Sequence, residues 1–162
     1  MTTVLRRRAF NAKAGCIAGA LALLALMIAS PARADRCDDL VKELKNQVDG
    51  LRVGQIAAGT VYLAHPKARE ITLGCSSKNL SNQLFAKADR KPTPAFMDLM
   101  AGAAAIVFTL PKDDMLKGVT RCVKRMGIFR GDDVTARYRR LDFRCIRSKT
   151  ESNITITRGL DQ

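Results

Sequence analysis

The chain has 162 residues, with 28 Lys and Arg residues against 15 Asp and Glu residues and a formal net charge of +13. This length provides for one domain. Because the chain contains a single histidine, its composition also excludes a histidine-rich metal site.

The first 34 residues have the layout of a secretory signal peptide. Residues 14–30 form a run of 17 small and apolar residues, followed by Pro31 and by an A-x-A cleavage pattern at 32–34. A run of this length is at the short limit for a membrane span, so cleavage is favoured over an uncleaved anchor, and no span is expected afterwards. The positive n-region before the run consists of Arg6, Arg7, Arg8 and Lys13.

This leader predicts a bacterial periplasmic or secreted location. Residues 7–10 resemble the core of a twin-arginine signal, but Asn11 stands where that motif prefers leucine. Twin-arginine substrates also fold before export, which fits poorly with disulfides formed afterwards. The general secretory (Sec) route is therefore favoured. The remaining domain, 35–162, retains 23 basic residues and a net charge of +8.

Four cysteines remain after the predicted cleavage, namely Cys37, Cys75, Cys122 and Cys145. An even number in an exported domain predicts two disulfides, for which three pairings exist. No pair has the C-x-x-C spacing of a zinc site or a redox motif, so structural bridges are expected, without a metal or cofactor. The favoured pairing is Cys37–Cys75 with Cys122–Cys145, in which each bridge ties a helix to the strand region that follows it.

A helix and then strands are predicted in the first half of the domain. Apolar residues recur near the 3.6-residue period over 37–51, which predicts an amphipathic helix. Segment 53–64 is ambiguous between strand and helix, and strand is favoured by its β-branched and aromatic residues. A turn at 65–67 leads to a strand at 69–75, where apolar and other residues alternate. The polar segment 76–91 is expected to be a connector with at most one helical turn.

Two helices are predicted in the second half. The pair Thr93-Pro94 is a helix start, and the following segment 95–108 is apolar nearly all round, which is typical of a buried helix. A second helix is expected to begin at Pro111, with its apolar residues in one stripe, and to stop at Gly127.

Strand signals return after these helices. The alternation of 134–146 slips at 139–140, which indicates a turn or a bulge there, and 154–157 is expected to be a final short strand. This order predicts an α+β fold, with a small antiparallel sheet, about three helices on one side and two disulfides. Segments 69–75 and 139–145 share an apolar-x-apolar-x-Cys pattern, which leaves an internal duplication open.

A basic cluster is the feature that points to a function. Six cations lie within 13 residues, with Tyr138 and Phe143 between them. We expect Arg137 and Arg139 to share a strand face, which Arg144 joins if the slip is a bulge. The planar guanidinium suits phosphate and carboxylate groups, although a merely solvated sheet face has the same pattern. The six cations are Arg137, Arg139, Arg140, Arg144, Arg147 and Lys149.

The function predicted from this cluster is a non-enzymatic exported binding domain. Its expected partner is an acidic protein or an anionic component of the envelope, and nucleic acid is not expected outside the cytoplasm. No catalytic residue is assigned, because the paired carboxylates at 38–39, 113–114 and 132–133 are explained by helix starts and a turn.

Two alternative functions stay open. An inhibitor or immunity-type protein that blocks another exported enzyme would need a protruding loop, for which 76–92 is the candidate. A hydrolase would need a site around His65, with this histidine beside a carboxylate in a deep pocket.

Overall fold

The computed structural model describes residues 34–75, 82–127 and 131–159. The predicted leader lies outside the described residues except for its last residue, Ala34, which begins the first described helix. None of the described helices is long and apolar enough to cross a membrane.

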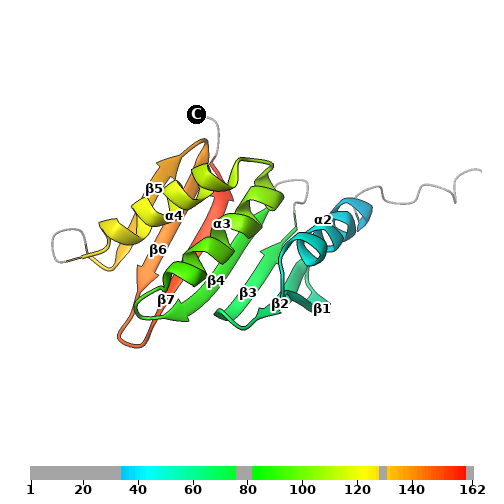
Figure 1. The fold of residues 1–162 in the computed structure, drawn as a ribbon, viewed down its shortest axis with the longest axis horizontal. Coiled ribbons are helices and arrows are strands. Elements are labelled where there is room, and N and C mark those ends of the chain that lie inside the picture. Colours follow the sequence, from blue (N-terminus) through cyan, green and yellow to red (C-terminus); the bar gives the residue numbers. More distant parts are fainter. Residues whose placement is uncertain (1–33, 76–81, 128–130, 160–162) are drawn as a thin grey trace, which may run out of the picture. The chain divides into compact units, whose positions relative to one another are not determined.

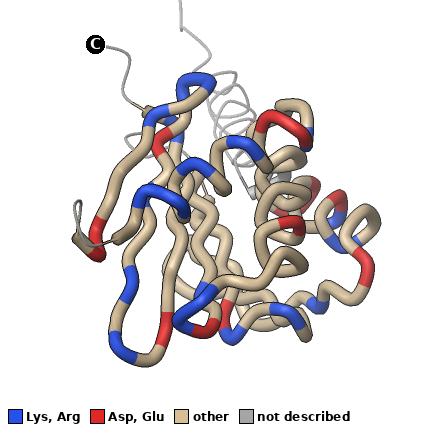
Figure 2. The backbone as a smooth tube through the Cα atoms, turned by 60° about the vertical axis from the view of Figure 1, so that its left-hand side comes forward, with Lys and Arg blue, Asp and Glu red and all other residues tan. Residues whose placement is uncertain are grey.

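The described residues form an antiparallel sheet of seven strands with three helices packed on one face (Figures 1 and 2). The strand order is β1-β2-β3-β4-β7-β6-β5. The predicted α+β fold, with its helices on one side of the sheet, is therefore confirmed. The helices are α2 (Ala34–Gln47), α3 (Pro94–Phe108) and α4 (Lys112–Arg125). The strands are β1 (Arg52–Ala57), β2 (Thr60–His65), β3 (Ala68–Gly74), β4 (Gln83–Asp89), β5 (Asp133–Tyr138), β6 (Leu141–Arg147) and β7 (Glu151–Arg158).

The core lies between the helices and one face of the sheet. Alternate residues of each strand point to opposite faces, so one row of cross-strand neighbours meets the helices while the next row points away. Both α3 and α4 cover this apolar row, and Figure 1 shows them running in front of the central strands. The residues of the row are Val61, Leu73, Leu84, Ile156, Phe143 and Ala136, all at most 1% exposed.

Both disulfides have the predicted pairing, Cys37–Cys75 and Cys122–Cys145. The first ties α2 to the residue after β3, and the second ties α4 to β6. The cysteines of the two pairs are 38 and 23 residues apart. Closing loops of this size contributes on the order of 3–4 kcal/mol each in the chain-entropy model.

The sheet order places the two cysteine strands in equivalent positions. Strands β2-β3-β4 and β5-β6-β7 are two antiparallel meanders that meet where β4 pairs with β7. Cys75 directly follows the middle strand of the first meander and Cys145 lies within the middle strand of the second, and each is bonded to a cysteine of a preceding helix. The similar segments 69–75 and 139–145 fall on these middle strands, and a duplication of the sequence stays a prediction.

The largest difference from the sequence-based expectation is in the segment 76–91. This segment is not simply a connector, because it contains β4, the central strand of the sheet. Its buried residues are Leu84, Ala86 and Ala88, and two alanines give a weak hydrophobic signal against polar neighbours. Residues 76–81 lie outside the described part of the chain.

Two other strand regions are resolved into hairpins. Segment 53–64 is strand, as favoured, but it forms β1 and β2 around a turn at Ala58-Gly59. The slip at Arg139-Arg140 is a turn between β5 and β6 rather than a bulge. All four turn residues have positive φ, between 49° and 75°, as in the two-residue turns whose twist suits antiparallel strands.

Helices α3 and α4 begin as their sequences predict. The Thr93 side chain accepts a hydrogen bond from the Phe96 N–H at 3.1 Å, and Pro94 occupies the first helical position. In α4, acidic residues occupy the first turn and basic residues the last, which complements the helix dipole.

A close approach between α4 and β6 depends on Gly118. A Cβ atom at this position would lie 2.5 Å from Cζ of Phe143, whose side chain is fully buried. We expect Gly118→Ala to destabilise the protein by about 1–3 kcal/mol, because overpacking exceeds the gain in helix propensity. Urea unfolding of the oxidised protein measures the change.

The matched control is Gly102→Ala in α3. A Cβ atom there would meet only Cε of Lys112 at 3.9 Å, so the free energy of unfolding should stay unchanged or rise by up to about 1 kcal/mol. Equal destabilisation of both variants would contradict the importance of the approach at Gly118.

Candidate functional site

The six cations of the predicted basic cluster do not form one patch. Arg139 and Arg140 lie in the β5–β6 turn, whereas Lys149 lies beyond the opposite end of β6. A strand of seven residues separates these ends by about 20 Å. Arg137 and Arg144 point to the sheet face that no described helix covers, because their neighbours Ala136 and Phe143 are buried under the helices.

The cations at this sheet face and its border are paired with acidic residues. Arg144 donates two hydrogen bonds to the Asp133 carboxylate, from Nη2 at 2.6 Å and from Nε at 3.0 Å. Arg147 lies 2.8 Å from the Asp132 carboxylate, and Arg137 is directly opposite Asp142. The hydrogen bond to Arg144 lowers the pKa of Asp133, and the reverse bond raises the pKa of Arg144.

The neighbouring strands of the same face continue this pairing. Lys87 on β4 lies 3.0 Å from the carboxylate of Glu70 on β3, and the hydrogen bond between them raises the pKa of Lys87. The uncovered sheet face therefore carries cations that are largely neutralised by adjacent carboxylates.

Arg139 does not share the face of Arg137, so that expectation is wrong. The turn conformation directs the Arg139 guanidinium toward α4, where its Nε lies 3.3 Å from Oδ2 of Asp114. Arg139 thereby joins a second group of basic residues, which the strand pattern did not reveal.

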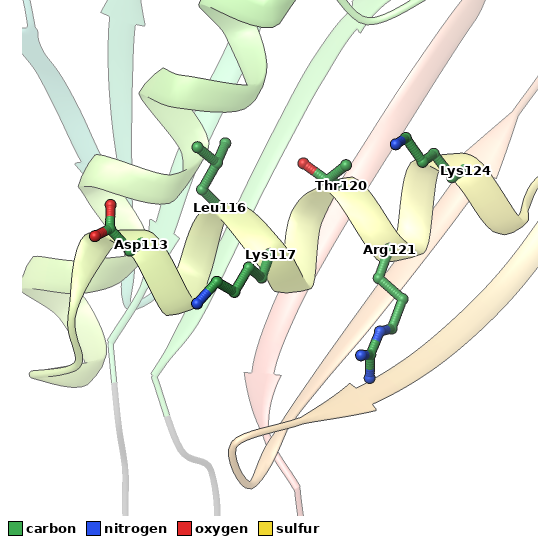
Figure 3. A pocket seen from close by; sticks show the side chains of 6 residues that line it. All are labelled: Asp113, Leu116, Lys117, Thr120, Arg121 and Lys124. Carbon is green, nitrogen blue, oxygen red and sulfur yellow. The ribbon is translucent and has the colours of Figure 1, made fainter.

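This second group, the α4 surface, lies along the outward side of α4 and includes Tyr138 and Arg139. The cations of α4 recur at intervals of four and three residues, which places them on the exposed part of the helix. Figure 3 shows Lys117 and Arg121 on one side of α4, with Leu116, Thr120 and Lys124 on the other. The α4 surface consists of Asp113, Asp114, Lys117, Arg121, Lys124, Tyr138 and Arg139.

Tyr138 is the centre of the α4 surface. The guanidinium carbon of Arg121 lies 5.0 Å from the centroid of its ring, and that of Arg139 lies 5.8 Å away. The phenol donates a hydrogen bond to Oδ1 of Asp114 at 3.3 Å. Because an aromatic face attracts a cation, the Tyr138 ring holds two guanidinium groups in one place.

Asp114 neutralises only part of this charge. Its carboxylate, 16% exposed, contacts Arg139 and lies 3.8 Å from Nζ of Lys117. The four cations of the α4 surface outnumber its two carboxylates. A guanidinium held over a ring face still has N–H donors that phosphate or carboxylate oxygens can accept.

The spacing of the basic residues in α4 was the available signal for this site. None of Lys117, Arg121 and Lys124 is among the binding residues predicted from the sequence. Nothing in the local pattern indicates that Tyr138 lies beside Arg121, because the two residues come together only when β5 packs against α4.

His65 holds two main-chain segments together. Its side chain is buried, with 8% of the residue exposed. Its Nε2 lies 2.9 Å from the main-chain oxygen of Asp49, and Nδ1 accepts the main-chain N–H of Lys67 at 3.1 Å. These contacts assign the ring proton to Nε2 and tie the end of α2 to the β2–β3 turn.

The hollow beside His65 is small, with a volume of about 190 Å³. Asp49 and Asp98 are among its lining residues, and Asp98 is paired with Lys112 at 2.8 Å. Because both ring nitrogens already bond the main chain, this geometry gives no support to a hydrolase, which stays an untested prediction. The inhibitor hypothesis predicted a protruding loop at 76–92. This prediction is wrong for 83–89, because these residues form β4.

His65→Ala is expected to destabilise the protein by about 1–3 kcal/mol, because it removes a buried side chain together with its two hydrogen bonds to the main chain of Asp49 and Lys67. The control is Lys67→Ala, which retains the main-chain N–H and should change little. Urea unfolding compares the two, and equal stability of the His65 variant and the parent protein would contradict the structural role.

The pairing of Arg144 with Asp133 predicts a pH effect of defined sign. A carboxyl whose pKa is lowered by folding stabilises the fold above its ordinary pKa of 3.8, and this stabilisation is lost as the pH falls through the lowered value. We expect Arg144→Gln to raise the pKa of Asp133, as followed by NMR titration. An unchanged Asp133 titration would show that the pair does not form in solution.

Comparisons of the chain with protein-family models, curated proteins and solved structures give no match. The function of this protein must therefore be argued from the geometry of its own side chains.

Proposed function

We propose that this protein is an exported, non-enzymatic binding protein that recognises an anionic partner through the α4 surface. The observation that carries the proposal is the placement of Arg121 and Arg139 against the Tyr138 ring, beside Lys117. Asp114 positions this group without cancelling its charge. The uncovered sheet face offers a weaker site, because Arg144 and its neighbours are already paired.

The two disulfides support a location outside the cytosol. Such bridges form and persist in oxidising compartments, and the pairing found here links both predicted helix–strand units. This location agrees with the leader predicted at 1–34. The partners available there are acidic protein surfaces and the phosphate-bearing envelope.

The shape of the α4 surface favours an extended partner over a small molecule. A shallow hollow lies along α4, and the described residues that line it all belong to this one helix (Figure 3). These residues therefore supply no opposite wall. Lys117 and Lys124 are seven residues apart, or about 10 Å along the helix. Figure 3 shows Lys124 on the opposite side of α4 from Lys117 and Arg121, so the cations spread over the helix and match several anionic groups on one surface better than a single small anion.

The test removes three cations of the α4 surface together, as Lys117→Gln, Arg121→Gln and Arg139→Gln. We expect binding to vesicles containing anionic lipid to weaken on the order of 100-fold, since each cation near such a surface contributes about 1 kcal/mol. Retention on heparin should fall in parallel, and both effects should shrink as salt is raised.

A matched control removes three cations that each have a carboxylate to themselves, as Lys87→Gln, Arg144→Gln and Arg147→Gln, whereas Lys117 and Arg139 of the test variant share the single carboxylate of Asp114. Both variants lose the same net charge, so a difference between them isolates the α4 surface. If both bind equally well, or equally badly, attraction depends on net charge alone and the proposed site is refuted.

A further inference from the structure

The exposed large apolar side chains of the described residues are concentrated in one hairpin. Val53, Ile56 and Tyr62 are 37%, 60% and 40% exposed, and all three belong to β1 or β2. Strand β1 is at the edge of the sheet, is paired only with β2 among the described strands, and has all six of its residues exposed. An exposed apolar edge is a template for pairing with another strand.

A bulge places the two apolar residues of β1 on the same face. Residues three apart in a regular strand point to opposite faces. The register shift in β1 instead sets Val53 opposite Leu63 and Ile56 opposite Val61. Both partners in β2 are buried under the helices, so Val53 and Ile56 extend the apolar face of the sheet at its edge.

The opposite edge of the sheet is different. Strand β5 carries the charged residues Asp133 and Arg137, and charged side chains on an edge strand oppose the addition of a further strand. In β1 the one charged residue is Arg52, at the first position of the strand. Of the two edges, β1 is therefore the one suited to pairing.

We propose that β1 pairs antiparallel with β1 of a second copy of this chain, so that one sheet continues through both molecules. With the two-fold axis between Gly54 and Gln55, Val53 of each copy lies opposite Ile56 of the other, so the interface contains this apolar pair two times. The same register sets Arg52 opposite Ala57 and brings no like charges together. The strand is thus complementary to itself, as an interface with two-fold symmetry requires.

The strand order also keeps the basic surfaces of the two copies apart. The helix α4 lies over β5 and β6, at the far side of the sheet from β1. Six strand spacings separate the two edges, or about 29 Å. Pairing at β1 therefore does not bring the α4 surfaces together, and it places one such surface at each end of the dimer.

Sedimentation velocity on the exported, oxidised protein over a wide range of concentrations tests this proposal. We expect a monomer–dimer equilibrium, in which Ile56→Lys weakens dimerisation by at least about tenfold because it places a cation in the apolar cross-strand pair. Ile56 is 60% exposed in the single chain, so the variant should keep its fold. The control, Thr135→Lys on the exposed side of β5, should dimerise like the parent protein.

Hydrogen exchange identifies the contact surface in the same samples. Amide protection within 52–57 should rise with protein concentration in the parent protein and should not rise in the Ile56→Lys variant. A monomer at every concentration overturns the proposal and assigns the bulge a protective role at this edge. A dimer that Ile56→Lys leaves intact also overturns it.

Discussion

The rest of the structure depends on the burial of one face of a seven-stranded sheet beneath its helices. The contact between Gly118 of α4 and the ring of Phe143 shows how closely the layers approach. Because alternate strand residues must point into this core, the intervening residues are directed to the other face. The two disulfides attach α2 and α4 to the sheet and so secure this layering at two places.

This constraint decides where the positive charge is available. The arginines between Arg137 and Arg147 are neighbours in sequence, but the turn at Arg139-Arg140 leaves Arg137 and Arg144 on the uncovered sheet face and directs Arg139 toward α4. Those on the sheet face meet carboxylates of adjacent strands, and exposed pairs of this kind add little stability while consuming charge. The cations that are only partly neutralised lie on the α4 surface, where Tyr138 and Asp114 hold Arg121, Arg139 and Lys117 in one group.

The two proposed surfaces lie at opposite edges of the sheet and differ in chemistry. One is basic and open, over β5 and β6, and its partner would be anionic. The other is an apolar strand edge whose complement is a second copy of itself. If both operate, each dimer presents two basic surfaces to one partner, and binding becomes bivalent, with an affinity that exceeds that of either surface alone. Either surface can operate without the other, because they share no residue.

Local chemistry determined several features that the sequence alone predicted correctly. Thr93 and Pro94 specify the start of α3 through a side-chain cap and a fixed φ, and the helix–strand order with its cysteines gave the fold class and the disulfide pairing. Strand β4 escaped detection because Ala86 and Ala88 become core residues only between β3 and β7. The direction of the Arg139 side chain and the position of Arg121 over the Tyr138 ring were likewise decided by tertiary structure, because they depend on elements that are distant in the chain.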